Sequence, residues 1–399
     1  MDRVVVGLSG GVDSSVAAHL LKEEGHDVVG LYMINWHNKT GTLSGDCPWK
    51  DDLLFAELVA KKLNIPFHTV DFSEQYRQRV VDYMFNEYGK GRTPNPDVLC
   101  NREVKFDLFI DKAKELGAKY IATGHYCRKE ILEKNGNPIY RLLTGTDPGK
   151  EQSYFLCQLS QEQISMALFP IGHLHKSEVR EIATKAGLPT ADKKDSQGVC
   201  FVGKINLPEF LQQKLSAQKG DIIEIPSDSF IYNDYCEVPV PPNPDEDQLE
   251  LLAKAIKYKP ENGKVVGQHN GAHFFTIGQR KGLNVGGKEQ PLFVIATDVE
   301  NNVVYTGQGD NHPGLYRSAL FIKKDEIHWI RPDLKLNPGG SSDYLMRIRY
   351  RQPLQKGKAF ITARGMYLLF KKAQRGITAG QFAAWYKGDE MIGSGVINE

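Results

Sequence analysis

Residues 3–15 read Arg3-Val4-Val5-Val6-Gly7-Leu8-Ser9-Gly10-Gly11-Val12-Asp13-Ser14-Ser15, an apolar run that passes through a glycine-rich turn into a helical pattern. Glycines let the backbone turn tightly and approach a ligand closely. Free N–H groups and the dipole at the start of a helix attract an anion, and Ser9 and Ser14 add hydroxyl donors. Asp13 can hold a magnesium ion. Since no Gly-Lys-Ser/Thr follows, this is not a Walker loop. The stretch predicts another kind of phosphate-binding loop, the alternative being an ordinary strand-to-helix turn.

The first 190 residues alternate apolar runs with helical periods, which indicates an α/β fold with a doubly wound parallel sheet. After the first strand we expect strands at 27–34, 67–70 and 120–123, and helices at 13–24, 53–63, 74–87 and 104–116. Ligands of such sheets bind at the carboxyl ends of the strands, which is where the glycine-rich turn lies.

The pattern changes near residue 205. One helix is expected at 206–215, and the proline-rich run 238–244 cannot be regular helix, so it is interpreted as a linker or a loop insertion. Strand-like runs follow at 292–296, 303–307, 345–350, 359–362, 367–370 and 381–386, which predict a small C-terminal β-barrel or sandwich. We therefore expect an α/β domain with the phosphate-binding loop at 1–205, a small central domain at 206–288 and the C-terminal β-domain at 289–399.

The chain has 399 residues, 41% of them hydrophobic, and a net charge of +1. It has no apolar run long enough to span a membrane and no secretory signal pattern, so we expect a cytoplasmic protein. Residues 344–388 contain ten Lys or Arg and no Asp or Glu. This favours a phosphate-facing surface, although a solvated strand face balanced by acids elsewhere would give the same pattern. Met346, Ile348 and Tyr350 alternate with Arg347, Arg349 and Arg351, which predicts one apolar and one basic face.

The six cysteines form no Cys-x-x-Cys pair, so a zinc ribbon or a thioredoxin-like motif is unsupported. Two of them lie in distinctive stretches. In Arg92–Asn101, Asp97 and Cys100 are three apart and can share one helix face, and the start of a helix lowers the pKa of a thiol. Cys200 follows a glycine in Ser196–Gly203. Both stretches have a structural alternative. In the first, Asp97 would be an N-cap beside a buried Cys100, and in the second, Cys200 would be a buried strand residue.

Several motifs together resemble the tRNA-specific 2-thiouridylases, the MnmA/TrmU family of PP-loop ATP pyrophosphatases. The resemblance runs through the whole chain. It includes the loop at 7–15, Gly-Arg-Thr-Pro-Asn-Pro-Asp at 91–97, Ala-Thr-Gly-His-Tyr at 122–126, Gln-Ser-Tyr-Phe-Leu at 152–156, Gly-Val-Cys-Phe at 198–201, Thr-Ile-Gly-Gln-Arg at 276–280 and Arg-Ile-Arg-Tyr-Arg at 347–351. Glu151 departs from a more usual Asp, and Ala379 from a common Pro beside Gln381. Relative to the family, the stretch at about 225–262 looks like an insertion in the central domain.

The resemblance implies ATP-dependent 2-thiolation of a wobble uridine in tRNA, with ATP and Mg²⁺ as cofactors. It makes Cys200 the persulfide carrier and Cys100 its partner, which attacks Cys200 to release the sulfur and leaves a disulfide. Asn95, Pro96 and Asp97 would surround the target base, where Asp97 could take or give a proton. Residues 7–14, Met33 and Gly124 would contact ATP. Contacts to tRNA would come from Lys150, Glu151, Gln152, Arg349, Tyr350, His125 and Gln381.

The partners implied are tRNA and an upstream sulfur donor, either a cysteine desulfurase or a sulfur-relay protein. Three other functions would use the same features differently. A PP-loop ligase that forms a C–N bond on a small molecule needs neither cysteine. A non-catalytic RNA-binding module would bind tRNA without forming AMP. A thiol redox or metal protein would use the cysteines alone, but their scatter argues against it.

Overall fold

The structure is a computed structural model that describes residues 1–37, 49–195, 206–233, 241 and 244–399. Its N-terminal part contains a five-stranded sheet in the order β3-β2-β1-β4-β7, and every pair in it is parallel. The strands are β1 (Arg3–Gly7), β2 (Asp27–Ile34), β3 (Phe67–Asp71), β4 (Tyr120–Ala122) and β7 (Ala167–Leu168). The predicted α/β fold with a parallel sheet is confirmed.

Helices cover both faces of this sheet because the strand residues alternate between two cores. Val4 and Val6 pack with α1 (Val12–Glu23), α2 (Trp49–Leu63) and α8 (Lys176–Lys185). Val5 faces the opposite core. That core is covered by two long helical stretches, each with a π-helical turn in its middle. They comprise α3 (Ser73–Tyr76), α4 (Asp82–Gly89), α5 (Pro96–Cys100) and α6 (Phe109–Glu115).

The C-terminal part is an antiparallel sheet that curls into a barrel. Its strands are β12 (Tyr316–Lys323), β13 (Ile327–Trp329), β14 (Ser341–Arg347), β15 (Gln355–Ile361), β16 (Gly365–Arg375), β17 (Phe382–Lys387) and β18 (Glu390–Val396). A bridge between Phe321 and Asn398 brings the first strand to the end of the last. Strand β14 ends at Arg347, so the expected strand 345–350 is too long at its carboxyl end.

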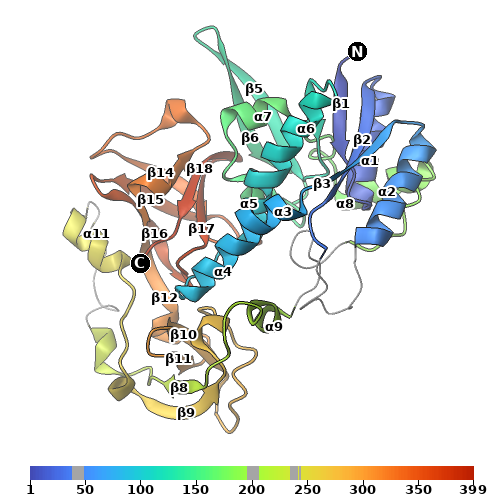
Figure 1. The fold of residues 1–399 in the computed structure, drawn as a ribbon. Helices are drawn as coiled ribbons and strands as arrows, with labels where there is room; N and C mark the ends of the chain where they lie inside the picture. The colour runs from blue at the N-terminus through green and yellow to red at the C-terminus, as the bar shows by residue number, and fades with distance from the viewer. Residues whose placement is uncertain (38–48, 196–205, 234–240, 242–243) are drawn as a thin grey trace.

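A hairpin from the N-terminal part also belongs to the barrel sheet. It consists of β5 (Cys127–Lys134) and β6 (Asn137–Thr144), and Leu143 of β6 pairs with Glu390 of β18. Figure 1 shows the hairpin rising beside α7 (Gln161–Met166), with the barrel strands below it. The two parts of the chain therefore share one hydrogen-bonded sheet.

The central part is a four-stranded sheet in the order β10-β11-β8-β9. It joins β8 (Gly220–Glu224) and β9 (Lys264–His269) to β10 (Leu292–Asp298) and β11 (Val303–Gln308). The expectation that 292–296 and 303–307 belong to the barrel is wrong, because strand patterns do not reveal partners. The expected boundary between 288 and 289 falls inside this sheet, and we propose a boundary after β11.

Two helices complete the central region. The expected helix at 206–215 is shorter, since α9 spans Leu207–Leu211. Within the presumed insertion, α11 (Glu246–Ala253) packs Leu249 and Ala253 against Tyr367 and Leu369 of the barrel. None of the helices in the described part of the chain is long and apolar enough to cross a membrane.

Candidate active site

The glycine-rich turn joins β1 to α1 and is held by its own hydroxyl groups. Ser9 donates its backbone N–H to Ser14 Oγ, and the two hydroxyl oxygens lie 3.1 Å apart. Ser15 donates its hydroxyl to the carbonyl of Gly11 at 2.8 Å. Gly10 has a φ of +71°, and a Cβ there would lie 2.0 Å from the Asp52 carbonyl oxygen, so only glycine fits. These contacts within the turn fix its shape.

Two further predicted ATP contacts come from the neighbouring strands. Met33 lies near the carboxyl end of β2, and Gly124 follows β4, so both are at the same edge of the sheet as the turn. A Cβ on Gly124 would lie 2.7 Å from the carbonyl carbon of Asp13 and 2.7 Å from the amide nitrogen of Ser14. The absence of a side chain at Gly124 is what lets β4 approach the turn.

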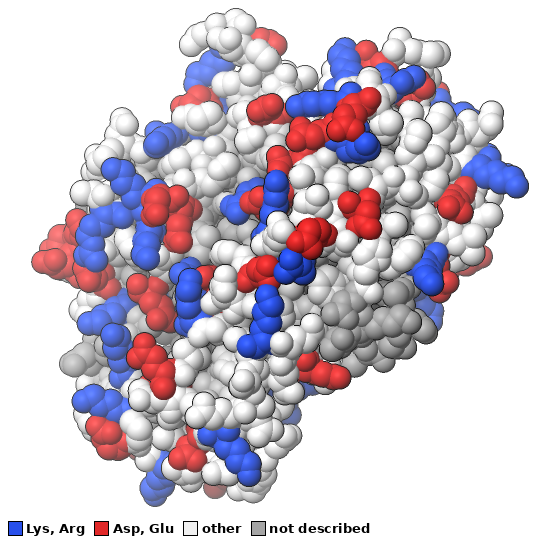
Figure 2. Space-filling view, in the orientation of Figure 1, with Lys and Arg blue, Asp and Glu red and all other residues white. Residues whose placement is uncertain are grey.

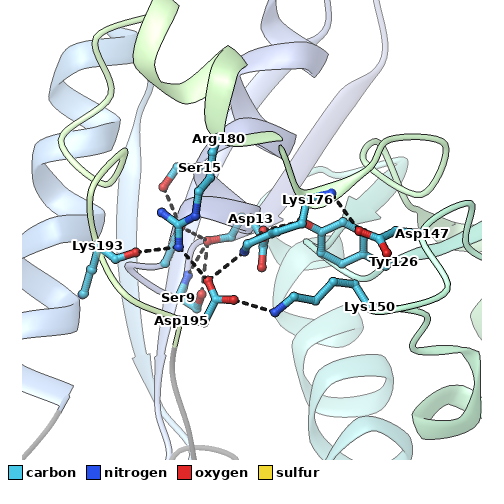
Figure 3. A network of polar contacts seen from close by, with 12 residues as sticks. Ser9, Asp13, Ser15, Tyr126, Asp147, Lys150, Lys176, Arg180, Lys193 and Asp195 are labelled. Atoms are coloured by element: carbon cyan, nitrogen blue, oxygen red, sulfur yellow. Dashed lines mark hydrogen bonds and ion pairs between the residues drawn. The ribbon is translucent and has the colours of Figure 1, made fainter. Parts of the chain in front are cut away.

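Asp13 is the carboxylate of the turn, and it has two partners. The hydroxyl of Tyr126 donates to Asp13 Oδ1 at 2.7 Å, and Lys176 Nζ lies 2.7 Å from the same oxygen (Figure 3). Burial, followed by the charge of Asp13, raises the pKa of Tyr126, so its hydroxyl remains a donor. In the described part of the chain no three His, Cys, Asp or Glu side chains gather as metal ligands. Asp13 nevertheless suits Mg²⁺, which is usually held by one or two carboxylates together with substrate phosphates.

A second carboxylate, Asp195, lies beside the turn and gathers three cations. Its oxygens lie 2.6 Å from Lys150 Nζ, 2.8 Å from Lys176 Nζ and 3.0 Å from Arg180 Nη2 (Figure 3). Burial alone would raise the pKa of Asp195, but hydrogen bonds from Lys150 and Lys176 outweigh it and lower the pKa to about 2. Lys193 also lies beside the turn, where it donates to the Gly10 carbonyl oxygen at 2.9 Å and to Asp52 at 2.6 Å. We call Lys150, Lys176, Arg180, Lys193 and Asp195 the charged rim.

Sequence reasoning missed most of this charged rim. Lys176, Arg180, Lys193 and Asp195 were not among the expected site residues, although they follow the last parallel strand, β7. The carboxyl ends of parallel strands share one edge, so the Lys- and Arg-rich run after β7 was the signal available. Lys150 was expected to contact tRNA, and its ammonium lies in this rim.

The segment 93–101 lies on the other side of the sheet edge. Asn95 caps α5 by accepting the backbone N–H of Val98 at 3.2 Å, and Pro96 is the first helical residue. The structural alternative that Asp97 is the N-cap is therefore wrong. Asp97 is half-buried, and Cys100 is fully buried in the core beneath it.

Gln381 from the barrel holds this segment in place. Its Nε2 donates to the carbonyl oxygens of Thr93 at 3.0 Å and Pro94 at 3.2 Å. Its Oε1 accepts from Asn95 Nδ2 at 3.4 Å. The predicted tRNA-contact residue Gln381 and the predicted base-contact residue Asn95 are thus in direct contact, 286 residues apart in the chain.

His125 connects the two sides of the site. It lies next to Gly124, and its ring is 6.0 Å from the ring of Phe106, in the helical stretch that continues from Cys100. Thr123 Oγ1 is 2.8 Å from His125 Nδ1. Burial, with a smaller effect of Lys105, holds the pKa of His125 well below its usual value, so the ring is neutral.

Two of the expected tRNA contacts point into the protein. Glu151 is buried and forms an ion pair with Arg347 at 2.5 Å, and it also accepts the backbone N–H of Ser153. Gln152 accepts the backbone N–H of Tyr126 at 3.0 Å. Glu151 and the half-buried Gln152 therefore both hold neighbouring parts of the site in place, and their contacts to tRNA stay predictions.

The expected basic face at 347–351 is wrong for Arg347, whose guanidinium is only 7% exposed in the pair with Glu151. Arg349 donates to the carbonyl of Arg375 and is exposed at the surface. The ring of Tyr350 lies 4.3 Å from that of Phe155. On the face drawn in Figure 2, acidic and basic side chains are interspersed rather than separated.

Cys200 lies outside the described residues, as do Cys47 and Cys236. The expected approach of Cys100 and Cys200 therefore stays a prediction. Cys127 and Cys157 are buried, and burial raises the pKa of both thiols, that of Cys157 to about 12. Thiols of such high pKa are poor nucleophiles, which leaves these two cysteines a structural role.

Known protein families match most of the chain. Three family models match: a tRNA methyl transferase HUP domain at 2–204, a tRNA methyl transferase PRC-barrel domain at 254–308 and an aminomethyltransferase β-barrel domain at 320–397. Among solved structures, a 4-thiouridine synthetase–RNA complex with bound ATP has a TM-score of 0.32 at 16% identity, covering 53% of this chain and 50% of that one. That likeness is too low to bear on function.

Full-length relatives are much closer. The protein named tRNA-specific 2-thiouridylase MnmA of Christiangramia forsetii is 60% identical over 398 residues, which cover 100% of both chains. The protein of the same name in Flavobacterium johnsoniae is 58% identical, again over 100% of both chains. With the HUP-domain model matching half of the sequence and identity this high from end to end, the chain belongs to the tRNA-specific 2-thiouridylase family.

Proposed function

We propose that this protein uses ATP to replace the 2-oxygen of a wobble uridine in tRNA with sulfur. The observation that carries the proposal is the meeting of two elements at one edge of the sheet. Gly124 closely contacts the glycine-rich turn, and the neighbouring His125 ring lies 6.0 Å from Phe106, which belongs to the helical stretch that continues from Asp97 and Cys100. Membership in the 2-thiouridylase family supplies the chemistry that such a pair can serve.

The first step is adenylation of the base. The uracil 2-oxygen attacks the α-phosphorus of ATP, a new O–P bond forms, and the bond to pyrophosphate breaks. The backbone N–H groups of the turn and the nearby cations offset the charge that develops on the phosphates. Asp13 would hold a magnesium ion, which adds positive charge at the same place.

The second step transfers sulfur. The terminal sulfur of a Cys200 persulfide attacks C2 of the base, and AMP leaves with the oxygen. The Cys100 thiolate then attacks Cys200 Sγ, which releases the sulfur to the base with its electron pair and leaves a Cys100–Cys200 disulfide. A thiol reductant must reopen that disulfide, and an upstream sulfur donor, a cysteine desulfurase or a sulfur-relay protein, must reload Cys200.

Asp97 is suited to proton transfer at the base. It lies one turn of helix before Cys100 and is half-buried, whereas His125 is held neutral in a buried position. The target base has to leave the anticodon stack to reach this edge, at a cost of about a few kcal/mol. We assign Arg349 and Tyr350, which follow β14, to tRNA contact.

The decisive experiment is reconstitution with protein, ATP, Mg²⁺, a persulfide-generating donor, a thiol reductant and unmodified tRNA. We expect 2-thiouridine and AMP in equal amounts. Cys200→Ser and Cys100→Ser should bind ATP normally but form no 2-thiouridine, and Cys157→Ser is the matched control. Thiolation by Cys200→Ser, or AMP formation without tRNA, would exclude the proposal. Affinity for tRNA should fall linearly on a log–log plot against salt concentration.

A further inference from the structure

Three cations converge on one carboxylate beside the phosphate-binding turn. Asp195 lies within 3.0 Å of Lys150, Lys176 and Arg180, all of which Figure 3 shows pointing toward it. A carboxylate carries one negative charge and has two oxygens. Three cations around it therefore leave positive charge available to a stronger anion.

Lys176 ties this cluster to the turn. Its ammonium bridges Asp195 and Asp13, at 2.8 Å and 2.7 Å, and its side chain is only 14% exposed. Asp195 is 33% exposed, about as much as Lys150 and Arg180, so these three side chains can be reached from solvent while Lys176 lies deeper. Together, Lys150, Lys176 and Arg180 outnumber Asp13 and Asp195, and the five side chains carry a net charge of +1.

We propose that the Asp195 carboxylate accepts the hydrogen bonds that the β- and γ-phosphates of ATP accept when ATP binds. Its carboxylate keeps Lys150, Lys176 and Arg180 gathered beside the turn, and the phosphates displace it and take over these cations. The inference rests on the proposed nucleotide site at this turn. It assigns the three cations to the leaving pyrophosphate, for which the turn at 7–15 provides no positively charged side chain.

Phosphate can replace the Asp195 carboxylate because carboxylate and phosphate oxygens accept the same hydrogen bonds from ammonium and guanidinium groups. The phosphate chain carries more negative charge than Asp195, so it competes well for them. Losing partly exposed ion pairs costs the protein little. When the α-phosphate bond breaks, charge accumulates on pyrophosphate, which Lys150, Lys176 and Arg180 then stabilise by direct contact.

The test compares three ligands that differ in their phosphates. ATP, inorganic pyrophosphate and AMP are titrated by calorimetry, each with Mg²⁺, into the full chain and its variants. Asp195→Asn removes the competing charge, so ATP and pyrophosphate should bind several-fold tighter while AMP binding stays the same. Lys176→Met should weaken ATP and pyrophosphate about 10- to 100-fold, with little effect on AMP.

The matched control is Lys185→Met. Lys185 is on the same helix, but it is 74% exposed and pairs with Glu181 at the surface, so its loss should change none of the three affinities. If Asp195→Asn weakens ATP binding, or changes ATP and AMP equally, Asp195 is a structural tie and the inference is wrong. Because these titrations contain no tRNA, they fail or succeed independently of the thiolation assay.

Discussion

Gly124→Ala tests whether the close approach of β4 sets the shape of the glycine-rich turn at 7–15, the proposed phosphate site. The new Cβ would lie 2.7 Å from Asp13 C, 2.7 Å from Ser14 N and 2.9 Å from Asp13 Cβ. Ordinary contacts begin near 3.4 Å, so the turn must shift by about 0.7 Å. Backbone and Cβ atoms cannot swing aside as a flexible side chain would.

Such overpacking costs about 1–3 kcal/mol. Because the strain falls on the amides that would bind phosphate, ATP affinity should drop roughly 5- to 150-fold. AMP affinity should drop in parallel, since the displaced groups would contact the α-phosphate. This distinguishes Gly124→Ala from Lys176→Met, which is expected to spare AMP.

Calorimetric titration of ATP and AMP measures the effect, and thermal unfolding of the same samples separates a local shift from global destabilisation. Gly286→Ala is the control, because a Cβ at Gly286 meets nothing within 4 Å. If the folded Gly124→Ala variant binds ATP as tightly as the natural protein, the turn is not the phosphate site or Gly124 does not shape it.

Three further outcomes follow from the contacts of the site. Arg347→Met leaves Glu151 buried without its partner and should lower the free energy of unfolding by about 3–5 kcal/mol in urea titrations; adding Glu151→Gln should recover part of that loss. His125 is neutral when folded but gains a proton when unfolded, so stability should fall below pH ~6.5 by up to ~1.4 kcal/mol per pH unit. His125→Gln should reduce this slope, and an unchanged slope would contradict the assignment. Gln381→Leu removes the three hydrogen bonds to Thr93, Pro94 and Asn95 and should lower kcat/KM for thiolation roughly tenfold, with ATP affinity unchanged; a parallel loss of ATP affinity would argue against a local effect on the 93–95 segment.

The sequence predicted the parts of the fold that local patterns determine. The run from Arg3 to Ser15 encodes strand, turn and helix in consecutive residues, and the alternation of Val4, Val5 and Val6 between two cores follows from strand geometry. The resemblance then pointed to Met33 and Gly124, which the structure places at the same sheet edge as the turn.

Features that depend on distant partners could not be predicted in the same way. Lys176 meets Asp13 across 163 residues, and Arg347 meets Glu151 across 196. The alternation of apolar residues and arginines in 346–351 is the same whether an arginine faces solvent or, like Arg347, a buried carboxylate. The runs at 292–308 were correctly predicted as strands, but their pattern held no information on which sheet they join.

The sheet shared between β6 and β18 has a consequence for how the chain is made. The β5–β6 hairpin forms from neighbouring residues, but its partner Glu390 follows Leu143 by about 250 residues. At roughly 5–20 residues per second, the ribosome delivers that partner about 10 to 50 seconds later. During this interval the outer edge of β6 is exposed and open to pairing with another nascent chain. A fragment that stops at residue 205 would keep that edge permanently, so we expect it to aggregate where the whole protein does not.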